Sequence, residues 1–413
     1  MNLPNSVMVM VLARLPVGNI GRLKSVCKEW KSLMESSYFR DLYGTINKKN
    51  LSSPWSILYR EESSNTALEF FCERYDFKES IGSCVSRFLS EMKTANKHRR
   101  MSALAITDGL ILLDVSTNYG HEVYCVADPV LRQWIKIPQP PPFSSHDSFE
   151  GTSLVTHMNK GDLLGYKVVR YGVPIFGMGI PMVRDRLCFQ IYSSESGNWT
   201  YHQVSTQRPI FKILPPSPIN LNGYLHWLCR GDQVIFAYDF YSPTELCRVI
   251  DLPQRSAKGS LKPPDQGNED TLSISCGSLM YMNTDTGRPN QQLKIWRLKN
   301  YKSGSSKDSW ELLWNLRPGL DLCLATNPVA MHPFDKEMVY LVTRETNFFQ
   351  THAYLVSGNL RTKKFQLNKD WKQKIMEFGD YEPRLFHQFV LPKRFGSIPC
   401  PRGCTLVTLP DQH

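Results

Sequence analysis

The chain has 413 residues, which is more than a single hydrophobic core usually fills, so we expect a small domain beside a large one. Hydrophobic residues make up 41% and charged residues 21%, as in ordinary soluble globular proteins, and the longest purely apolar run, Val7 to Ala13, is too short to span a membrane. The formal net charge is +11, but the basic residues are scattered, so nucleic acid is not an expected partner.

The eleven cysteines are odd in number and lie far apart, which argues against a disulfide framework. We therefore expect a reducing, intracellular location, in the nucleus, the cytoplasm or both. The closest pair, Cys400 and Cys404, has no second pair after it, so no zinc site is predicted. No basic residue precedes the run Val7 to Ala13 and no cleavage site follows it, so a secretory signal is not expected either.

Two Leu-Pro pairs frame the start of the chain, Leu3-Pro4 and Leu15-Pro16. Proline is accepted in the first turn of a helix but disrupts its interior, so Asn5–Arg14 is predicted as one short helix. A second helix is predicted over Val17–Cys27 and a third over Glu29–Ser36, because apolar side chains recur there at three- and four-residue spacing. The first helix is apolar on nearly every side, which indicates that a partner or another domain covers its second face.

The two Leu-Pro pairs, the Val26-Cys27-Lys28-x-Trp30-x-x-Leu33 core and Phe39 together resemble an F-box, particularly its plant form. That resemblance implies binding to a Skp-type adaptor and, through it, to the cullin of a ubiquitin ligase. The adaptor-binding residues that it implies are Leu3, Pro4, Val7, Val11, Leu12, Leu15, Pro16, Ile20, Leu23, Val26 and Trp30. The alternative is three core helices that bind no adaptor.

The sequence departs from the F-box pattern at four positions. Asn5 and Ser6 stand where acidic residues are usual, and Gly18 and Gly21 stand where Lys and Leu are usual. Glycine weakens a helix by roughly 0.5–1 kcal/mol relative to alanine, so we expect adaptor affinity below that of a typical F-box.

Beyond the first helices, short apolar strands recur at 109, 165, 223, 277 and 337, at intervals of 56, 58, 54 and 60 residues. Each one begins a predicted unit of three strands joined by polar turns. Five such units at a near-constant period predict a β-propeller. Strands at Ser53–Arg60 and Glu69–Phe77 are predicted to share a sixth blade with Arg384–Leu391, which closes the ring and removes its open edges.

The propeller region resembles the kelch-like F-box-associated domain of plant F-box proteins. The matching residues span roughly 108–298 and are Asp108-Gly109-Leu110, Asp128-Pro129 before Arg132-Gln133-Trp134, the run Tyr166–Val169, the run Asn222–Trp227 and Leu293–Trp296. The predicted fold is thus α+β and multidomain, with a three-helix F-box before an all-β kelch-like propeller of about six blades. The predicted divisions are the F-box (1–45), a linker with the first propeller strands (46–107), the propeller (108–395) and a C-terminal tail (396–413), whose removal from Ile398 onward should be tolerated.

No catalytic motif was found, and neither a metal site nor a cofactor is predicted. The resemblance implies a non-catalytic substrate receptor of a Skp–cullin–F-box ubiquitin ligase, which binds a protein target for ubiquitination and degradation. The alternatives are an adaptor-bound scaffold that triggers no degradation, or a propeller that binds a ligand without any adaptor. Because strands alternate in direction, the loops after the apolar strands gather at one end of the ring, where we expect the target to bind. These loops hold Tyr119, His121, Tyr171, Phe176, Met178, Arg230, Asp232, Arg288, Phe348 and Phe349.

Overall fold

The structure is a computed structural model of the chain. It describes residues 4–15, 23, 26–46, 55–60, 67–72, 80–96, 101–115, 123–143, 147–159, 161–174, 184–210, 218–230, 232–253, 268–285, 292–299, 309–317, 326–347, 350–375, 386–391 and 396–409. Within these residues, no helix combines the length and the apolarity that crossing a bilayer requires.

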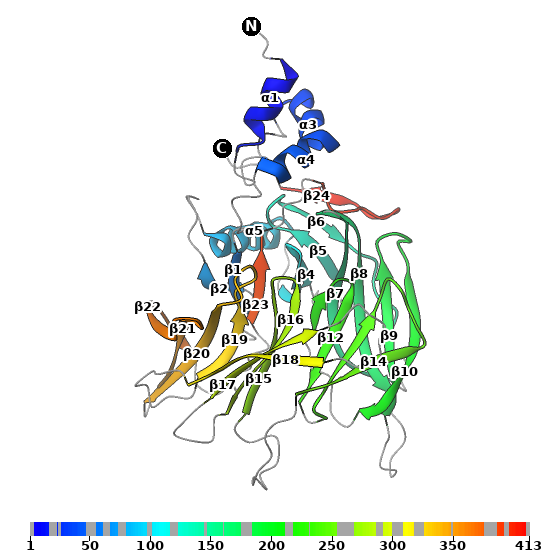
Figure 1. The fold of residues 1–413 in the computed structure, drawn as a ribbon. Helices are drawn as coiled ribbons and strands as arrows, with labels where there is room; N and C mark the ends of the chain where they lie inside the picture. The colour runs from blue at the N-terminus through cyan, green and yellow to red at the C-terminus, as the bar shows by residue number, and fades with distance from the viewer. Residues whose placement is uncertain are drawn as a thin grey trace.

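Three short helices form the N-terminal module: α1 (Asn5–Leu12), α3 (Lys28–Glu35) and α4 (Ser37–Ile46). Figure 1 shows them together at one end of the molecule, on the side where β6 (Gln133–Lys136) and β24 (Leu406–Thr408) lie. The first and third predicted helices agree with α1 and α3. Most of the predicted second helix lies outside the described residues, and α4 was not predicted as a helix.

Five antiparallel units of four strands follow in chain order (Figure 1). Unit 1 consists of β3 (Ser102–Thr107), β4 (Leu110–Asp114), β5 (Tyr124–Asp128) and β6 (Gln133–Lys136). Unit 2 consists of β7 (Asp147–Asn159), β8 (Asp162–Pro174), β9 (Arg184–Ser193) and β10 (Trp199–Ile210). Unit 3 consists of β11 (Ile219–Leu221), β12 (Tyr224–Cys229), β13 (Val234–Asp239) and β14 (Leu246–Asp251). Unit 4 consists of β15 (Asn268–Ser275), β16 (Ser278–Asp285), β17 (Leu293–Lys299) and β18 (Ser309–Leu316), and unit 5 of β19 (Thr326–Met331), β20 (Met338–Asn347), β21 (Gln350–Asn359) and β22 (Lys364–Ile375).

The prediction of three strands per unit was wrong, because another strand precedes each apolar repeat. In three units a tight turn with two left-handed residues joins this extra strand to the next one. The φ angles are 45° and 74° at Asp108-Gly109, 54° and 86° at Asn222-Gly223, and 48° and 70° at Cys276-Gly277. Positive φ at both central positions is typical of the type I′ turn, whose twist matches that of a β-hairpin. The recurring glycine therefore marks the middle of a hairpin and not the start of a unit.

The two ends of the β region pair with each other, as predicted. A three-stranded closing sheet has β1 (Trp55–Arg60) between β2 (Ala67–Cys72) and β23 (Phe386–Val390). In addition, β10 of unit 2 and β14 of unit 3 pair in parallel at Ser205–Leu246 and Thr206–Cys247, which joins these units into one eight-stranded sheet. In the part of the chain that the structure describes, the hydrogen bonds thus define five sheets, and the number of separate blades stays a prediction.

Apolar clusters fill the space between neighbouring units all the way around. The cluster between units 2 and 3 includes Tyr171, Phe189 and Trp227. Similar clusters join unit 1 to unit 2, unit 3 to unit 4, unit 4 to unit 5, unit 5 to the closing sheet, and the closing sheet to unit 1. Each unit therefore packs on two neighbours, and among the described residues the circle has no open end, as a propeller requires.

A helix that was not predicted, α5 (Ile81–Asn96), packs between the closing sheet and unit 1. Its buried side chains follow helical spacing and are Ile81, Val85, Phe88, Leu89 and Met92. An ion pair of 2.5 Å joins Glu91 of the helix to Arg132 of unit 1. The helix therefore covers the interface at which the ring closes.

The predicted C-terminal tail is part of the fold. Strand β24 (Leu406–Thr408) pairs with β6 and becomes the outermost strand of the sheet of unit 1. Ile398 is 2% exposed and lies in the cluster between units 1 and 2. Burial of this side chain indicates that removal from Ile398 onward, which the sequence predicted to be tolerated, lowers stability.

A turn motif recurs in units 1, 2 and 5, between the third and fourth strands. A polar side chain before the turn accepts a backbone N–H, a residue four positions later has positive φ, and an aromatic residue follows two positions after that. The three sets are Asp128, Arg132 (φ 54°) and Trp134; Ser193, Gly197 (φ 72°) and Trp199; and Asn359, Lys363 (φ 56°) and Phe365. The shared geometry supports an origin of the units as a repeated element.

His226 in β12 makes the stability of unit 3 depend on pH. Its Nδ1–H donates to the carbonyl oxygen of Ile219 (3.1 Å), and burial lowers the pKa of its imidazole to about 4. Between pH 6.5 and 4 the unfolded chain binds a proton that the folded chain excludes, so folding is favoured fully above pH 6.5 and progressively less as the pH falls toward 4. The predicted loss is on the order of 3 kcal/mol.

Urea unfolding of the protein and of His226→Gln at several pH values measures this effect. The stability of the natural chain should fall more steeply below pH 6.5 than that of the variant. Identical slopes would show that another group controls the acid sensitivity.

Candidate docking site

The N-terminal module has a hydrophobic core of its own. This core contains Val9 and Leu12 of α1 and its C-cap residue Ala13. They pack against Met34 of α3 and against Phe39 and Tyr43 of α4. Burial raises the pKa of the Tyr43 hydroxyl to about 12, so this side chain stays neutral. Among the described residues, all the members of this core lie between residues 8 and 46, so the helices of the module pack on one another.

The opposite face of α1 is apolar and exposed. Val7, Met10 and Val11 are 44%, 40% and 51% exposed. Their i, i+3, i+4 spacing places the three side chains on one side of the helix, and we call them the α1 stripe. Valine and methionine side chains left this accessible on a short helix favour an interface with a partner.

Two side-chain caps hold α3 and α4 in place behind the α1 stripe. The Cys27 sulfur accepts the backbone N–H of Trp30 at 3.4 Å and caps the start of α3. The Ser36 hydroxyl donates to the carbonyl oxygen of Leu33 (2.7 Å) and accepts the N–H of Phe39 (3.2 Å). Ser36 thereby ends one helix and begins the next, which fixes the angle between them.

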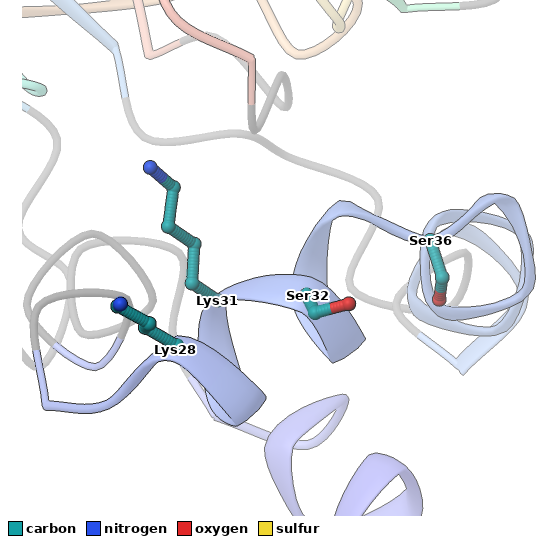
Figure 2. Close-up of a pocket in the computed structure, with 4 residues that line it drawn as sticks. All are labelled: Lys28, Lys31, Ser32 and Ser36. Atoms are coloured by element: carbon teal, nitrogen blue, oxygen red, sulfur yellow. The ribbon is translucent and has the colours of Figure 1, made fainter.

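A pocket of about 480 Å³ lies on this module and is lined by Lys28, Lys31, Ser32 and Ser36. Figure 2 shows the Lys28 and Lys31 side chains leaving α3 on the same side, whereas the Ser32 hydroxyl points away from them. Val26 and Tyr38, which are 62% and 61% exposed, also belong to the module. The module therefore presents both positive charge and apolar side chains to a partner.

The predicted adaptor residues occupy different environments. Pro4, Val7, Val11 and Val26 are exposed, Leu15, Leu23 and Trp30 are half-buried against the module core, and Leu12 is buried in it. Leu3, Pro16 and Ile20 lie outside the described residues. Met10 and Tyr38 are exposed apolar residues that were not predicted as adaptor-binding residues. The sequence around them does not distinguish an exposed side chain from a buried one.

Among the predicted target-binding residues, Tyr171 was wrongly placed in a loop. It lies in β8 and is fully buried, with its ring centroid 5.4 Å from that of Trp227. Arg230 follows β12 and donates from Nη2 to the carbonyl oxygen of Asp270 (2.5 Å), which links unit 3 to unit 4. Asp232 is half-buried. The remaining positions, Tyr119, His121, Phe176, Met178, Arg288, Phe348 and Phe349, lie outside the described residues.

The described residues contain no group of three or more His, Cys, Asp or Glu side chains that could hold a metal ion. The cysteines whose side chains are described are free thiols. Burial raises the pKa of Cys125 and of Cys247 to about 12, so neither supplies a reactive thiolate at neutral pH.

Family comparisons match both parts of the chain. An F-box domain model matches residues 1–42, and a model described as "F-box protein At3g26010-like, beta-propeller" matches residues 53–382. Three relatives from Arabidopsis thaliana match nearly end to end. Putative F-box protein At3g23970 is 31% identical over 97% of this chain and 100% of its own, and F-box protein At1g49990 is 32% identical over 95% and 97%. Putative F-box/kelch-repeat protein At4g22430 is 30% identical over 95% and 91%. The chain therefore belongs to the F-box proteins that carry an At3g26010-like β-propeller.

Proposed function

We propose that this protein is the substrate receptor of a Skp–cullin–F-box ubiquitin ligase. The α1 stripe is the observation that carries the proposal, because it presents Val7, Met10 and Val11 outward from a module whose core is already filled. A Skp-type adaptor covers this stripe, and the propeller holds the target protein. The protein acts by positioning, because transfer of ubiquitin becomes effectively intramolecular once the target and the ligase share one assembly.

Replacing Val7 and Val11 by glutamate should lower adaptor affinity at least thirtyfold. Burying two unpaired carboxylates in an apolar interface is costly, and the loss of one interface anchor corresponds to about 2 kcal/mol. Glutamate is a good helix former, and Val7 lies in the first turn of α1, where a negative charge is favoured, so α1 should persist. The affinity of the full chain for the adaptor is measured by calorimetry, with folding checked by circular dichroism.

Leu312→Glu in unit 4 is the matched control, because Leu312 is 43% exposed, close to the exposure of Val7, but lies in the propeller. It should leave adaptor affinity unchanged. Full-strength binding by the Val7→Glu and Val11→Glu double variant would overturn the docking assignment, whereas a natural chain that binds no adaptor would favour a propeller that works alone. Reconstituted ubiquitination of captured proteins then separates a receptor from an adaptor-bound scaffold, since a scaffold binds the adaptor but supports no transfer.

A further inference from the structure

Asp147, at the start of β7, carries a buried carboxylate that only neutral groups contact. The residue is 8% exposed. The Tyr201 hydroxyl donates to its Oδ2 at 2.9 Å, and the Cys188 thiol donates to its Oδ1 at 3.3 Å. Burial raises the pKa of the Cys188 thiol to about 11 and also raises the pKa of the Tyr201 hydroxyl, so both remain neutral donors. An ionised carboxylate has about four acceptor positions, and two neutral donors leave part of that capacity unused.

No basic side chain among the described residues forms an ion pair with Asp147. Arg170, on the same unit, directs Nη1 to the carbonyl oxygen of Pro141 (3.1 Å) and to Oε1 of Gln190 (2.5 Å). The flanking segments 144–146 and 175–183 contain no lysine or arginine in their sequences. Burying a carboxylate without a cation costs several kcal/mol, so this position gains from a cation supplied by another molecule.

Aromatic side chains lie beside the carboxylate at the surface. Phe149 and Tyr201 are 43% and 47% exposed, and Phe149 lies on the same face of β7 as Asp147 because it follows two positions later in the strand. The ring centroids of Phe149 and Phe143 are 5.6 Å apart. The guanidinium carbon of Arg170 lies 5.0 Å from each of these two ring centroids and holds the rings in place.

Gly172 in β8 makes this arrangement possible. A Cβ at this position would lie 2.0 Å from the carbonyl oxygen of Ser148 and 3.0 Å from Cε1 of Phe143. The missing side chain lets the backbone at the start of β7 and the Phe143 ring approach β8 closely. We call Asp147, Tyr201, Phe143 and Phe149 the Asp147 patch.

We propose that the Asp147 patch binds one lysine or arginine side chain of the target protein. A cation beside a carboxylate forms a charge-assisted hydrogen bond, and the aliphatic stem and charged head of lysine or arginine pack well on exposed aromatic rings. The inference rests on the proposed function, because it names the chemistry of the target that the receptor holds. Asp147 pairs with Pro174 at the end of β8, from which residues 175–183, including the predicted target residue Phe176, continue.

Charge also restricts the segment that surrounds this side chain. The protein carries a net charge of +11, so a uniformly basic segment would be repelled on approach. A neutral or acidic segment with a single basic residue avoids repulsion by the net positive charge and still supplies a cation to the Asp147 carboxylate. The same carboxylate would repel the phosphates of a nucleic acid or a phosphopeptide, which makes an unmodified protein segment the fitting partner.

Photo-crosslinking to the full chain tests the proposal even if binding is weak. One probe is a Gly/Ser nonapeptide with a central arginine next to a diazirine residue, and the other replaces the arginine by citrulline, its neutral counterpart. The arginine probe should label the protein at least tenfold more than the citrulline probe, with labelled sites near residues 143–149 and 201 by mass spectrometry. Equal labelling by the two probes, or labelling mainly elsewhere, would overturn the proposal.

Variants separate this site from general electrostatics. Asp147→Asn should remove the preference for arginine, whereas Glu195→Gln, which deletes an exposed carboxylate of the same unit, should keep it. Tyr201→Ala retains the carboxylate and removes a half-exposed ring, so labelling of this variant by the arginine probe should also fall. If Asp147→Asn fails to fold, Tyr201→Ala becomes the variant that tests the site. Equal losses of labelling in Asp147→Asn and Glu195→Gln would refute a local site.

Asp147→Asn should still bind the adaptor, and the Val7→Glu and Val11→Glu variant should still be labelled by the arginine probe. Failure of the docking proposal and failure of the Asp147 patch proposal are therefore recognised separately.

Discussion

A chain that ends at residue 385 should fail to fold, because it lacks the strand that closes the ring. All five residues of β23 pair with β1, in a register that runs from Trp55–Val390 to Tyr59–Phe386. Phe389 of this strand is fully buried in the cluster of α5 and unit 1. Truncating a buried phenylalanine alone costs about 3–5 kcal/mol, and loss of β23 also leaves one edge of β1 unpaired. The sum is comparable with the 5–15 kcal/mol of stability typical of a folded domain.

A chain that ends at residue 395 is the matched control. It keeps β23 but loses β24 and Ile398, so it should fold cooperatively with a stability lower by roughly 2–5 kcal/mol. Thermal melting followed by circular dichroism distinguishes the three chains. A cooperative transition at an unchanged temperature in the chain that ends at 385 would mean that the β region is an open array.

Trp55→Ala should be among the most destabilising single substitutions. The Trp55 side chain is fully buried, its Nε1–H donates to Nε2 of His332 (3.1 Å), and its ring centroid lies 5.2 Å from that of Tyr340. It thus connects the closing sheet to unit 5. Loss of a buried tryptophan costs about 3–5 kcal/mol. Trp55→Phe keeps most of the packing and removes the hydrogen bond, and should cost roughly 1–3 kcal/mol.

Urea unfolding measures these changes, and Trp310→Ala provides the comparison. Trp310 also donates from Nε1, to the carbonyl oxygen of Asp251 (2.7 Å), but its side chain is only half-buried in unit 4. Its removal should therefore cost less than half as much as the removal of Trp55. A larger loss for Trp310→Ala than for Trp55→Ala would show that the closing interface contributes little to stability.

The sequence predicted the repeat and the closure of the ring because strong local signals recur in it. Apolar strands, most of them beginning at a glycine, follow a period of 54 to 60 residues, and unpaired strands remain at both ends. The extra first strand of each unit gave a weaker signal. β11 has three residues and β19 contains Pro328, which normally argues against a strand in a sheet. Their pairing with the next strand in tertiary structure outweighs these local preferences.

The helix α5 could have been predicted, because Ile81, Val85, Phe88, Leu89 and Met92 follow helical spacing and Ser80 caps the start. Strand β24 could not, because three residues carry no periodicity and their partner, β6, lies far earlier in the chain. Contacts between such distant segments follow from the closed fold and not from local pattern.

The F-box pattern predicted the N-terminal module, but periodicity could not orient its first helix. Because Val7 to Leu12 are all apolar, Val11 and Leu12 are equivalent in sequence, yet one is exposed and the other buried. The Asp147 patch gave no signal at all, since its residues come from the connection before β7, from β7 and from β10. Only the folded sheet brings the Asp147 carboxylate to the Tyr201 hydroxyl.

The parallel pairing of β10 with β14 affects how the propeller opens. Units 2 and 3 are joined by a parallel strand pairing at Ser205–Leu246 and Thr206–Cys247, whereas no other two neighbouring units in the described residues join their strands into one sheet. Amide protons in β10 and β14 should therefore exchange with solvent together, as one cooperative unit, and more slowly than those at the other outer edges. Tyr201 of the Asp147 patch lies in β10, so a side chain bound there meets a strand that is already ordered and loses little affinity to conformational entropy.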